Sequence, residues 1–143
     1  MTKDELFRLE EAAWEPLHDL AHRLGAETAE RPYTELWTVK DGVAHVACWQ
    51  AEAAQMLIRI REGTYEGWDD GREEEVNALF HASTRHLSLD VVIAQLHASR
   101  VRMLEELDLL PVALLDDEAR SWFAESGHEH YAEHLDGLRE AVG

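Results

Sequence analysis

The sequence predicts an all-α domain, a four-helix bundle with a long crossover between its second and third helices. Two observations predict this fold. The chain of 143 residues contains only 3 Pro and 8 Gly, and these residues divide it into long segments. Apolar residues within those segments recur every three or four positions, which is the periodicity of amphipathic helices. We expect residues 1–143 to form a single domain, since a chain of this length can bury a hydrophobic core.

The first predicted helix covers residues 2–25. Thr2 and Glu5 have the spacing of a capping box, and Gly25 ends the segment. A linker that contains Pro32 follows. The predicted inward stripe of this helix consists of Leu6, Leu9, Ala13, Leu17, Leu20 and Leu24.

The second predicted helix runs from a capping-box pair, Thr38 and Asp41, to about residue 63. Its inward face consists of Val43, Val46, Ala53, Leu57 and Ile60. Residues 63–88 are less regular, and we interpret them as the crossover. Within them, residues 73–85 have the composition of a short helix.

The third predicted helix begins after Ser88, which is a suitable N-cap. Pro111 and the acidic residues 116–118 are expected to separate it from the last helix, for which Ser126 and Glu129 form another capping-box pair. The third helix directs Leu89, Val92, Ile93, Leu96, Met103, Leu104 and Leu107 inward. The last helix directs Tyr131, Leu135, Leu138 and Val142 inward.

The charge and cysteine content exclude several functional classes. A formal charge of −17 argues against nucleic-acid or anionic-membrane partners, because phosphate binding depends on Lys and Arg. No apolar stretch approaches the roughly 20 residues of a membrane span. A single cysteine, Cys48, cannot form an internal disulfide, and the N-terminal residues lack a secretion signal. We therefore expect a cytoplasmic protein.

Nine histidines are the most informative polar residues, and two pairs have the i,i+4 spacing that places two imidazoles on one helical face. His18 and His22 point away from the stripe of the first helix, so we interpret them as a hydrated surface pair. His130 and His134 flank the stripe of the last helix, where they can face a neighbouring helix. Position therefore favours the second pair as metal ligands.

A catalytic metal site usually needs three protein ligands, so a third donor should come from another helix. His45 flanks the core one to two turns after the Thr38 cap. If the second and last helices start at the same end of the bundle, His45, His130 and His134 lie in one layer. The alternative is that these are three unconnected histidines at the edge of the core.

Other residues close to the histidines in sequence are not assigned to the site. Glu129 and Glu133 point about 100° away from their histidine neighbours on a helix, so we expect them to face solvent. Cys48 points away from the apolar stripe and is interpreted as structural. Trp49 and Tyr131 are assigned to the core, with the wall of a pocket as a second possibility.

The residues around these histidines resemble the motifs of a known family. The segment from Trp37 to Trp49, WTVKDGVAHVACW, resembles the second-helix signature of the DinB-like superfamily of bacterial metalloenzymes. Residues 130–135, HYAEHL, resemble the closing motif of that family. Residues 75–78, together with the loop around Trp68, are similar to the ClbS/DfsB branch of four-helix bundles.

The resemblance implies a four-helix bundle in which His45, His130 and His134 bind one divalent metal ion, and it implies assembly as a homodimer. Relatives include thiol S-transferases and resistance proteins against DNA-damaging compounds. The sequence thus predicts a metal-dependent S-transferase or hydrolase acting on an electrophilic small molecule, with a low-molecular-weight thiol as one candidate co-substrate. Zinc, nickel, iron and cobalt all accept imidazole ligands.

Two further hypotheses stay open. The protein could be a non-catalytic binding protein of the ClbS/DfsB type that sequesters a small molecule and confers stress resistance. It could also be a purely structural dimerisation module, although that leaves the predicted layer of histidines unexplained.

Overall fold

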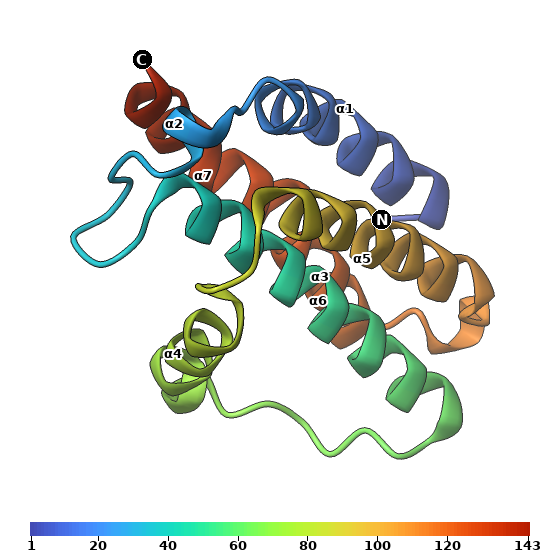
Figure 1. Ribbon diagram of the computed structural model, residues 1–143. Helices are drawn as coiled ribbons and strands as arrows, with labels where there is room; N and C mark the ends of the chain where they lie inside the picture. The colour runs from blue at the N-terminus through green and yellow to red at the C-terminus, as the bar shows by residue number, and fades with distance from the viewer.

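A computed structural model describes residues 1–143, and the fold is all-α, as the sequence predicts. Figure 1 shows a bundle built from α1, α3, α5 and the pair α6–α7, with α4 carried on the long connection between α3 and α5. The helices are α1 (Lys3–His22), α2 (Ala26–Ala29), α3 (Val39–Glu62), α4 (Glu73–Thr84), α5 (Leu89–Leu109), α6 (Asp117–Ser126) and α7 (His128–Val142). Two 3₁₀ turns, η1 (Asp70–Arg72) and η2 (Val112–Leu114), precede α4 and α6. None of these helices combines the length and the apolar composition needed to cross a membrane.

The predicted N-caps of the first three long helices are present in the structure. Thr38 and Asp41 form a reciprocal capping box at the start of α3, and Gly63 ends α3 in the left-handed conformation with φ of 76°. The side chains of Thr2 and Ser88 accept hydrogen bonds from the first turns of α1 and α5. The prediction for α1 was wrong in two respects. Leu9 is 42% exposed, and the helix ends at His22, while Gly25 is the N-cap of α2.

The prediction for the last helix was wrong at its beginning. Ser126 is buried inside the helical segment and caps nothing. The acidic residues 116–118 start a helix instead of separating two: the Asp116 side chain caps α6 by accepting from the Ala119 N–H at 2.9 Å. Gly127 interrupts the helix with a ψ of −116°, and the break requires glycine, because a Cβ there would lie 2.7 Å from the Phe123 carbonyl oxygen. The fourth side of the bundle is therefore two consecutive helices, α6 and α7.

The central helix α3 runs antiparallel to the α6–α7 pair (Figure 1). Near the start of α3, Gly42 lies against Leu138, which is close to the end of α7. Near the end of α3, Leu57 shares a core cluster with Phe123 of α6. This arrangement brings the second turn of α3 beside the first turns of α7.

A buried relay of hydrogen bonds fixes the register of four helices. The Glu10 carboxylate of α1 is fully buried and accepts two hydrogen bonds from the Arg100 guanidinium of α5, at 2.8 and 2.6 Å. It also accepts one from the Tyr131 hydroxyl of α7 at 2.8 Å, and the Gln50 amide of α3 donates to that hydroxyl at 2.8 Å. Buried charges of this kind are tolerated only when they are paired, so the relay admits one helix register.

Candidate metal centre

Three imidazoles meet between α3 and α7. The Nε2 atom of His130 lies 3.0 Å from that of His45 and 3.0 Å from that of His134. The three candidate ligand atoms all lie within 4.8 Å of one another. His45 and His130 are each only 7% exposed, and His134 is partly exposed. The structure thus brings together the three histidines that the sequence singled out.

The reason for this convergence differs from the one that the sequence suggested. We expected the second and last helices to start at the same end of the bundle, but α3 and α6–α7 are antiparallel. The histidines meet because α6 occupies the first half of the last helical segment and delays the start of α7. His130 and His134 therefore lie level with His45 in the second turn of α3. Tyr131, next to His130, anchors this register through Gln50.

The spacing of the three donors fits a single divalent ion. Nitrogen atoms bound at about 2.0–2.1 Å to one ion lie roughly 2.9 Å apart at a right angle and roughly 3.3 Å apart at the tetrahedral angle. The observed separations of 3.0 Å fall in this interval. Moreover, the His130 Nε2 carries either one N–H or one lone pair, so it can form a hydrogen bond across only one of its two short contacts. A cation at the common point would satisfy all three lone pairs.

Burial keeps the site in the state that binds cations. Loss of solvent lowers the pKa of His45 to about 3, with a further contribution from nearby His134. The same burial, reinforced by His134 and His45, lowers the pKa of His130 to about 2. Burial also lowers the pKa of His134. The imidazoles are consequently neutral at pH 7, and each has a lone pair to donate.

Tyr33 orients one of these ligands, and the sequence analysis missed it. Its hydroxyl oxygen lies 2.6 Å from the Nδ1 atom of His134. With Nε2 of His134 on a cation, Nδ1 carries the hydrogen and donates it to the Tyr33 oxygen, a partner that fixes both tautomer and ring orientation. The ring of Tyr33 fits because two neighbours are glycines: a Cβ on Gly42 or Gly137 would lie 2.8 or 3.0 Å from it. Glycines inside two helices were the available signal of such close packing.

A cavity of about 680 Å³ opens beside the triad. All three histidines line it, so a bound ion would face a space large enough for one or two small molecules. Four of the five tryptophans of the chain form walls, and three of them contact one another edge to face at centroid distances of 5.7 and 5.5 Å. These four tryptophans are Trp37, Trp49, Trp68 and Trp122.

The remaining cavity wall is strongly acidic. Six carboxylates line it, and no lysine or arginine does. Glu129 and Glu133 are exposed, as expected, yet both belong to this wall. Burial and the surrounding carboxylates, Glu129 first among them, raise the pKa of Glu125. The six residues are Asp70, Glu73, Glu118, Glu125, Glu129 and Glu133.

The structure also places the residues that the sequence assigned to the core. Tyr131 is fully buried and does not line the cavity, whereas Trp49 is buried and forms part of the cavity wall. The Trp49 indole N–H donates to the Asn77 side chain of α4 at 2.8 Å. Cys48 does not line the cavity, and burial raises the pKa of its thiol to about 11. Cys48 therefore stays protonated and is no nucleophile at neutral pH.

The hydroxyl of Tyr33 should strengthen metal binding. Tyr33→Phe removes the acceptor for the His134 Nδ1–H while keeping the ring between the two glycines, and we expect affinity for Zn²⁺ to fall by roughly 10–100-fold. Competition with a fluorescent chelator measures the change. The control is Tyr65→Phe, which removes a tyrosine hydroxyl that hydrogen-bonds Glu118 and Trp122 but none of the three histidines. Equal affinities of Tyr33→Phe and wild type would refute this role.

The stability of the metal-free protein should depend on pH through the buried histidines. In the unfolded chain, His45 and His130 regain a pKa near 6.5. As the pH falls, these histidines are therefore protonated in the unfolded state before they are protonated in the folded state. Their stabilising contribution is therefore complete above pH 6.5 and decreases as the pH falls from 6.5 toward 3. Each histidine can account for up to about 1.4 kcal/mol per pH unit.

Urea unfolding in the presence of a chelator, at pH 7.5 and pH 5.0, measures this effect. The double variant His45→Gln/His130→Gln should lose less free energy of unfolding between the two pH values than wild type. If both proteins lose the same amount, the two histidines are not responsible.

Comparison with known proteins bears on the fold. No family model and no curated protein sequence matches the chain. The structure is similar to the crystal structure of an uncharacterised protein from Escherichia coli UTI89, with a TM-score of 0.84 and 14% sequence identity. The similarity covers 98% of this chain and 92% of that one. It shows that the whole chain adopts a fold already seen in a solved protein.

Proposed function

We propose that the protein is a metal-dependent enzyme that acts on a small molecule bound in the cavity beside His45, His130 and His134. One observation carries the proposal: three imidazoles with ligand spacing, two of them buried, line a cavity of about 680 Å³. A structural metal site is usually closed by four protein ligands, whereas a catalytic site keeps a position open. Three histidines at the edge of a cavity correspond to the open type.

Each residue of the site would have a distinct role. The three histidines hold the ion, which, when bound, lowers the pKa of a water or thiol ligand and so supplies a nucleophile at neutral pH. Tyr33 keeps the His134 ring in its binding orientation. Burial raises the pKa of Tyr33, and the charge of Glu133, which also lines the cavity, adds to this effect; the same charge partly offsets the burial that lowers the pKa of His134. Zinc, nickel, iron and cobalt are all compatible with three imidazole ligands.

The charge of the cavity indicates which substrates fit. Six carboxylates and no basic residue favour a neutral or cationic molecule and disfavour one with several negative charges. Two arginines of the bundle form ion pairs away from the cavity wall: Arg100 pairs with Glu10, and Arg61 pairs with Glu106. The tryptophan walls suit a flat or apolar electrophile.

The nucleophile distinguishes two versions of the proposal. Water as nucleophile would make the protein a hydrolase, and a low-molecular-weight thiol would make it an S-transferase. The cavity is large enough to hold a thiol together with an electrophile. Its acidic wall restricts such a thiol to one of low negative charge.

The second candidate function is sequestration of a small molecule without catalysis. The observation in its favour is the tryptophan wall, which would bind an aromatic or apolar compound without a metal ion. This function predicts that ligand binding survives when the three histidines are replaced.

The homodimer that the family resemblance implies stays a prediction.

Metal titration of tag-free protein, combined with activity assays, tests the proposal. We expect a tightly bound divalent ion. Its affinity should drop in His45→Ala and in His134→Ala by more than the roughly 10–100-fold expected for loss of a hydrogen-bond partner of a ligand, such as the Tyr33 hydroxyl. The control is His86→Ala, which changes an exposed histidine outside the cavity wall. Turnover of electrophilic esters, amides or epoxides, with and without thiols, should disappear in the same two variants.

Two results would count against the enzyme. If His45→Ala binds as many ions per chain as wild type, and with the same affinities, the triad is not a metal site. If metal binding is lost but a compound still protects the triple alanine variant against thermal unfolding, sequestration is the better account.

A further inference from the structure

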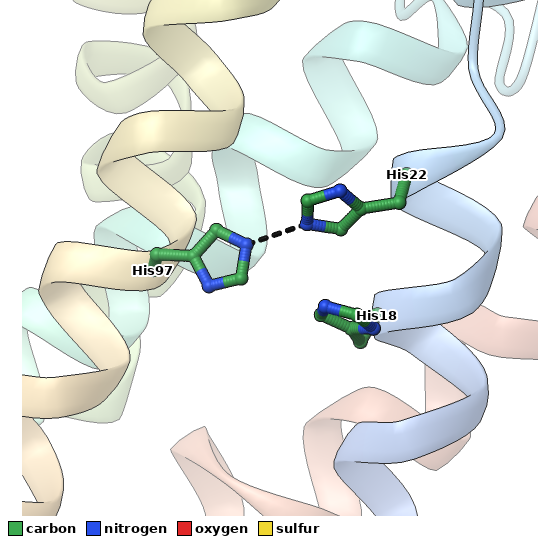
Figure 2. Close-up of side chains that lie close together, drawn as sticks. All are labelled: His18, His22 and His97. Atoms are coloured by element: carbon green, nitrogen blue, oxygen red, sulfur yellow. Dashed lines mark hydrogen bonds between the residues drawn. The ribbon is translucent and has the colours of Figure 1, made fainter.

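A second cluster of histidines lies on another part of the bundle, between α1 and α5. His18 and His22 in the last turns of α1 meet His97 of α5, and Figure 2 shows the three rings turned toward a common gap. The candidate ligand atoms of the three residues all lie within 4.8 Å of one another. None of the three lines the cavity beside the first triad.

This arrangement corrects the interpretation of His18 and His22 as a hydrated surface pair. The sequence shows their i,i+4 spacing but not their partner, because His97 is 75 residues away from His22 along the chain. Trp14 forms the floor of the cluster: it is 5% exposed, and its ring lies 5.8 Å from that of His18 and 5.7 Å from that of His97. His22 is exposed, so the opposite side of the cluster is open to water.

The donor atoms are placed as metal ligands would be. The Nε2 atoms of His22 and His97 lie 2.7 Å apart, slightly closer than the 2.9 Å that two nitrogens on one ion would show at about a right angle. At this separation one ring must be neutral, since two N–H groups would collide. Burial and the neighbouring His22 and His18 lower the pKa of His97, which keeps its lone pair available.

His18 has a hydrogen-bond acceptor for its second ring nitrogen, as metal-binding histidines usually do. Its Nδ1 lies 3.3 Å from the Asp19 carboxylate, which can accept the Nδ1–H and leave Nε2 free for an ion. Arg100 also lowers the pKa of His97, but its guanidinium is held by two hydrogen bonds to Glu10. The formal charge of −17 adds a general attraction for cations.

We propose that His18, His22 and His97 form a second binding site for a divalent transition-metal ion. Three imidazoles without a carboxylate ligand select ions such as Zn²⁺, Ni²⁺ or Cu²⁺ over Mg²⁺ and Ca²⁺, which prefer oxygen. The bound ion would join α1 to α5 across 75 residues of chain and so stabilise the folded state, by an amount that grows with the logarithm of the free ion concentration above Kd. The site is independent of the triad that faces the cavity.

The test separates the two sites. Tag-free His45→Ala/His130→Ala/His134→Ala protein, which lacks the first triad, is titrated with Ni²⁺ and with Zn²⁺ by calorimetry, and thermal unfolding is followed with and without each ion. We expect one ion per chain and a rise in Tm of several degrees. Adding His97→Ala should weaken binding at least tenfold and abolish the rise in Tm, whereas adding His86→Ala should change neither.

The result that overturns the proposal is equally specific. Absence of binding in the protein without the first triad, or binding that His97→Ala leaves unchanged, would show that the cluster is only a packed group of imidazoles. If the triple variant does not fold, the same comparison is made in wild type, where His97→Ala should reduce the bound ions from two per chain to one. A wild-type stoichiometry that His97→Ala does not change would again refute the second site.

Discussion

The contact between α3 and α7 is the constraint on which the rest of the structure depends. A hydrogen-bonded relay from Arg100 through Glu10 and Tyr131 to Gln50 joins four helices at their centre. Sliding α7 by one turn would remove the Tyr131 hydroxyl from both the fully buried Glu10 carboxylate and the Gln50 amide, and the protein interior penalises such lost hydrogen bonds. Because Tyr131 follows His130, the register that satisfies the relay is also the register that brings the triad together.

The same constraint explains why the site is both buried and open. The relay and the packing of Tyr33 against Gly42 hold the histidine rings from one side, so that solvent is excluded and their pKa values fall. On the other side, α4 and the long connection that carries it do not close over the histidines, and they leave a cavity with acidic and tryptophan walls. An ion held by the triad would therefore be rigidly bound by the protein and accessible to a small molecule.

Much of the fold could be predicted from the sequence because its signals are local. Thr38 with Asp41 and Gly63 mark the ends of α3 by interactions within one turn. The end of the chain was predicted less well: Ser126 and Glu129 have capping-box spacing close to the start of α7, but Gly127 is the N-cap, and α6, which begins at the Asp116 cap, was missed. Local spacing alone did not separate these two consecutive helices.

The site was predictable only where its residues share a helix or a motif. His130 and His134 have i,i+4 spacing, and His45 was added by its position beside the core. Tyr33 and His97 could not be found in this way, because their partners lie 101 and 75 residues away and depend on how the helices pack. For the same reason Glu129 and Glu133 were correctly placed at the surface, while their common cavity was not foreseen.

Anomalous scattering from crystals grown with Zn²⁺ and recorded across the zinc absorption edge tests the central claim most directly. We predict a peak between His45, His130 and His134, about 2.0–2.1 Å from each Nε2 atom. A map without a peak at this position, in crystals that contain zinc, would contradict a metal centre at the cavity.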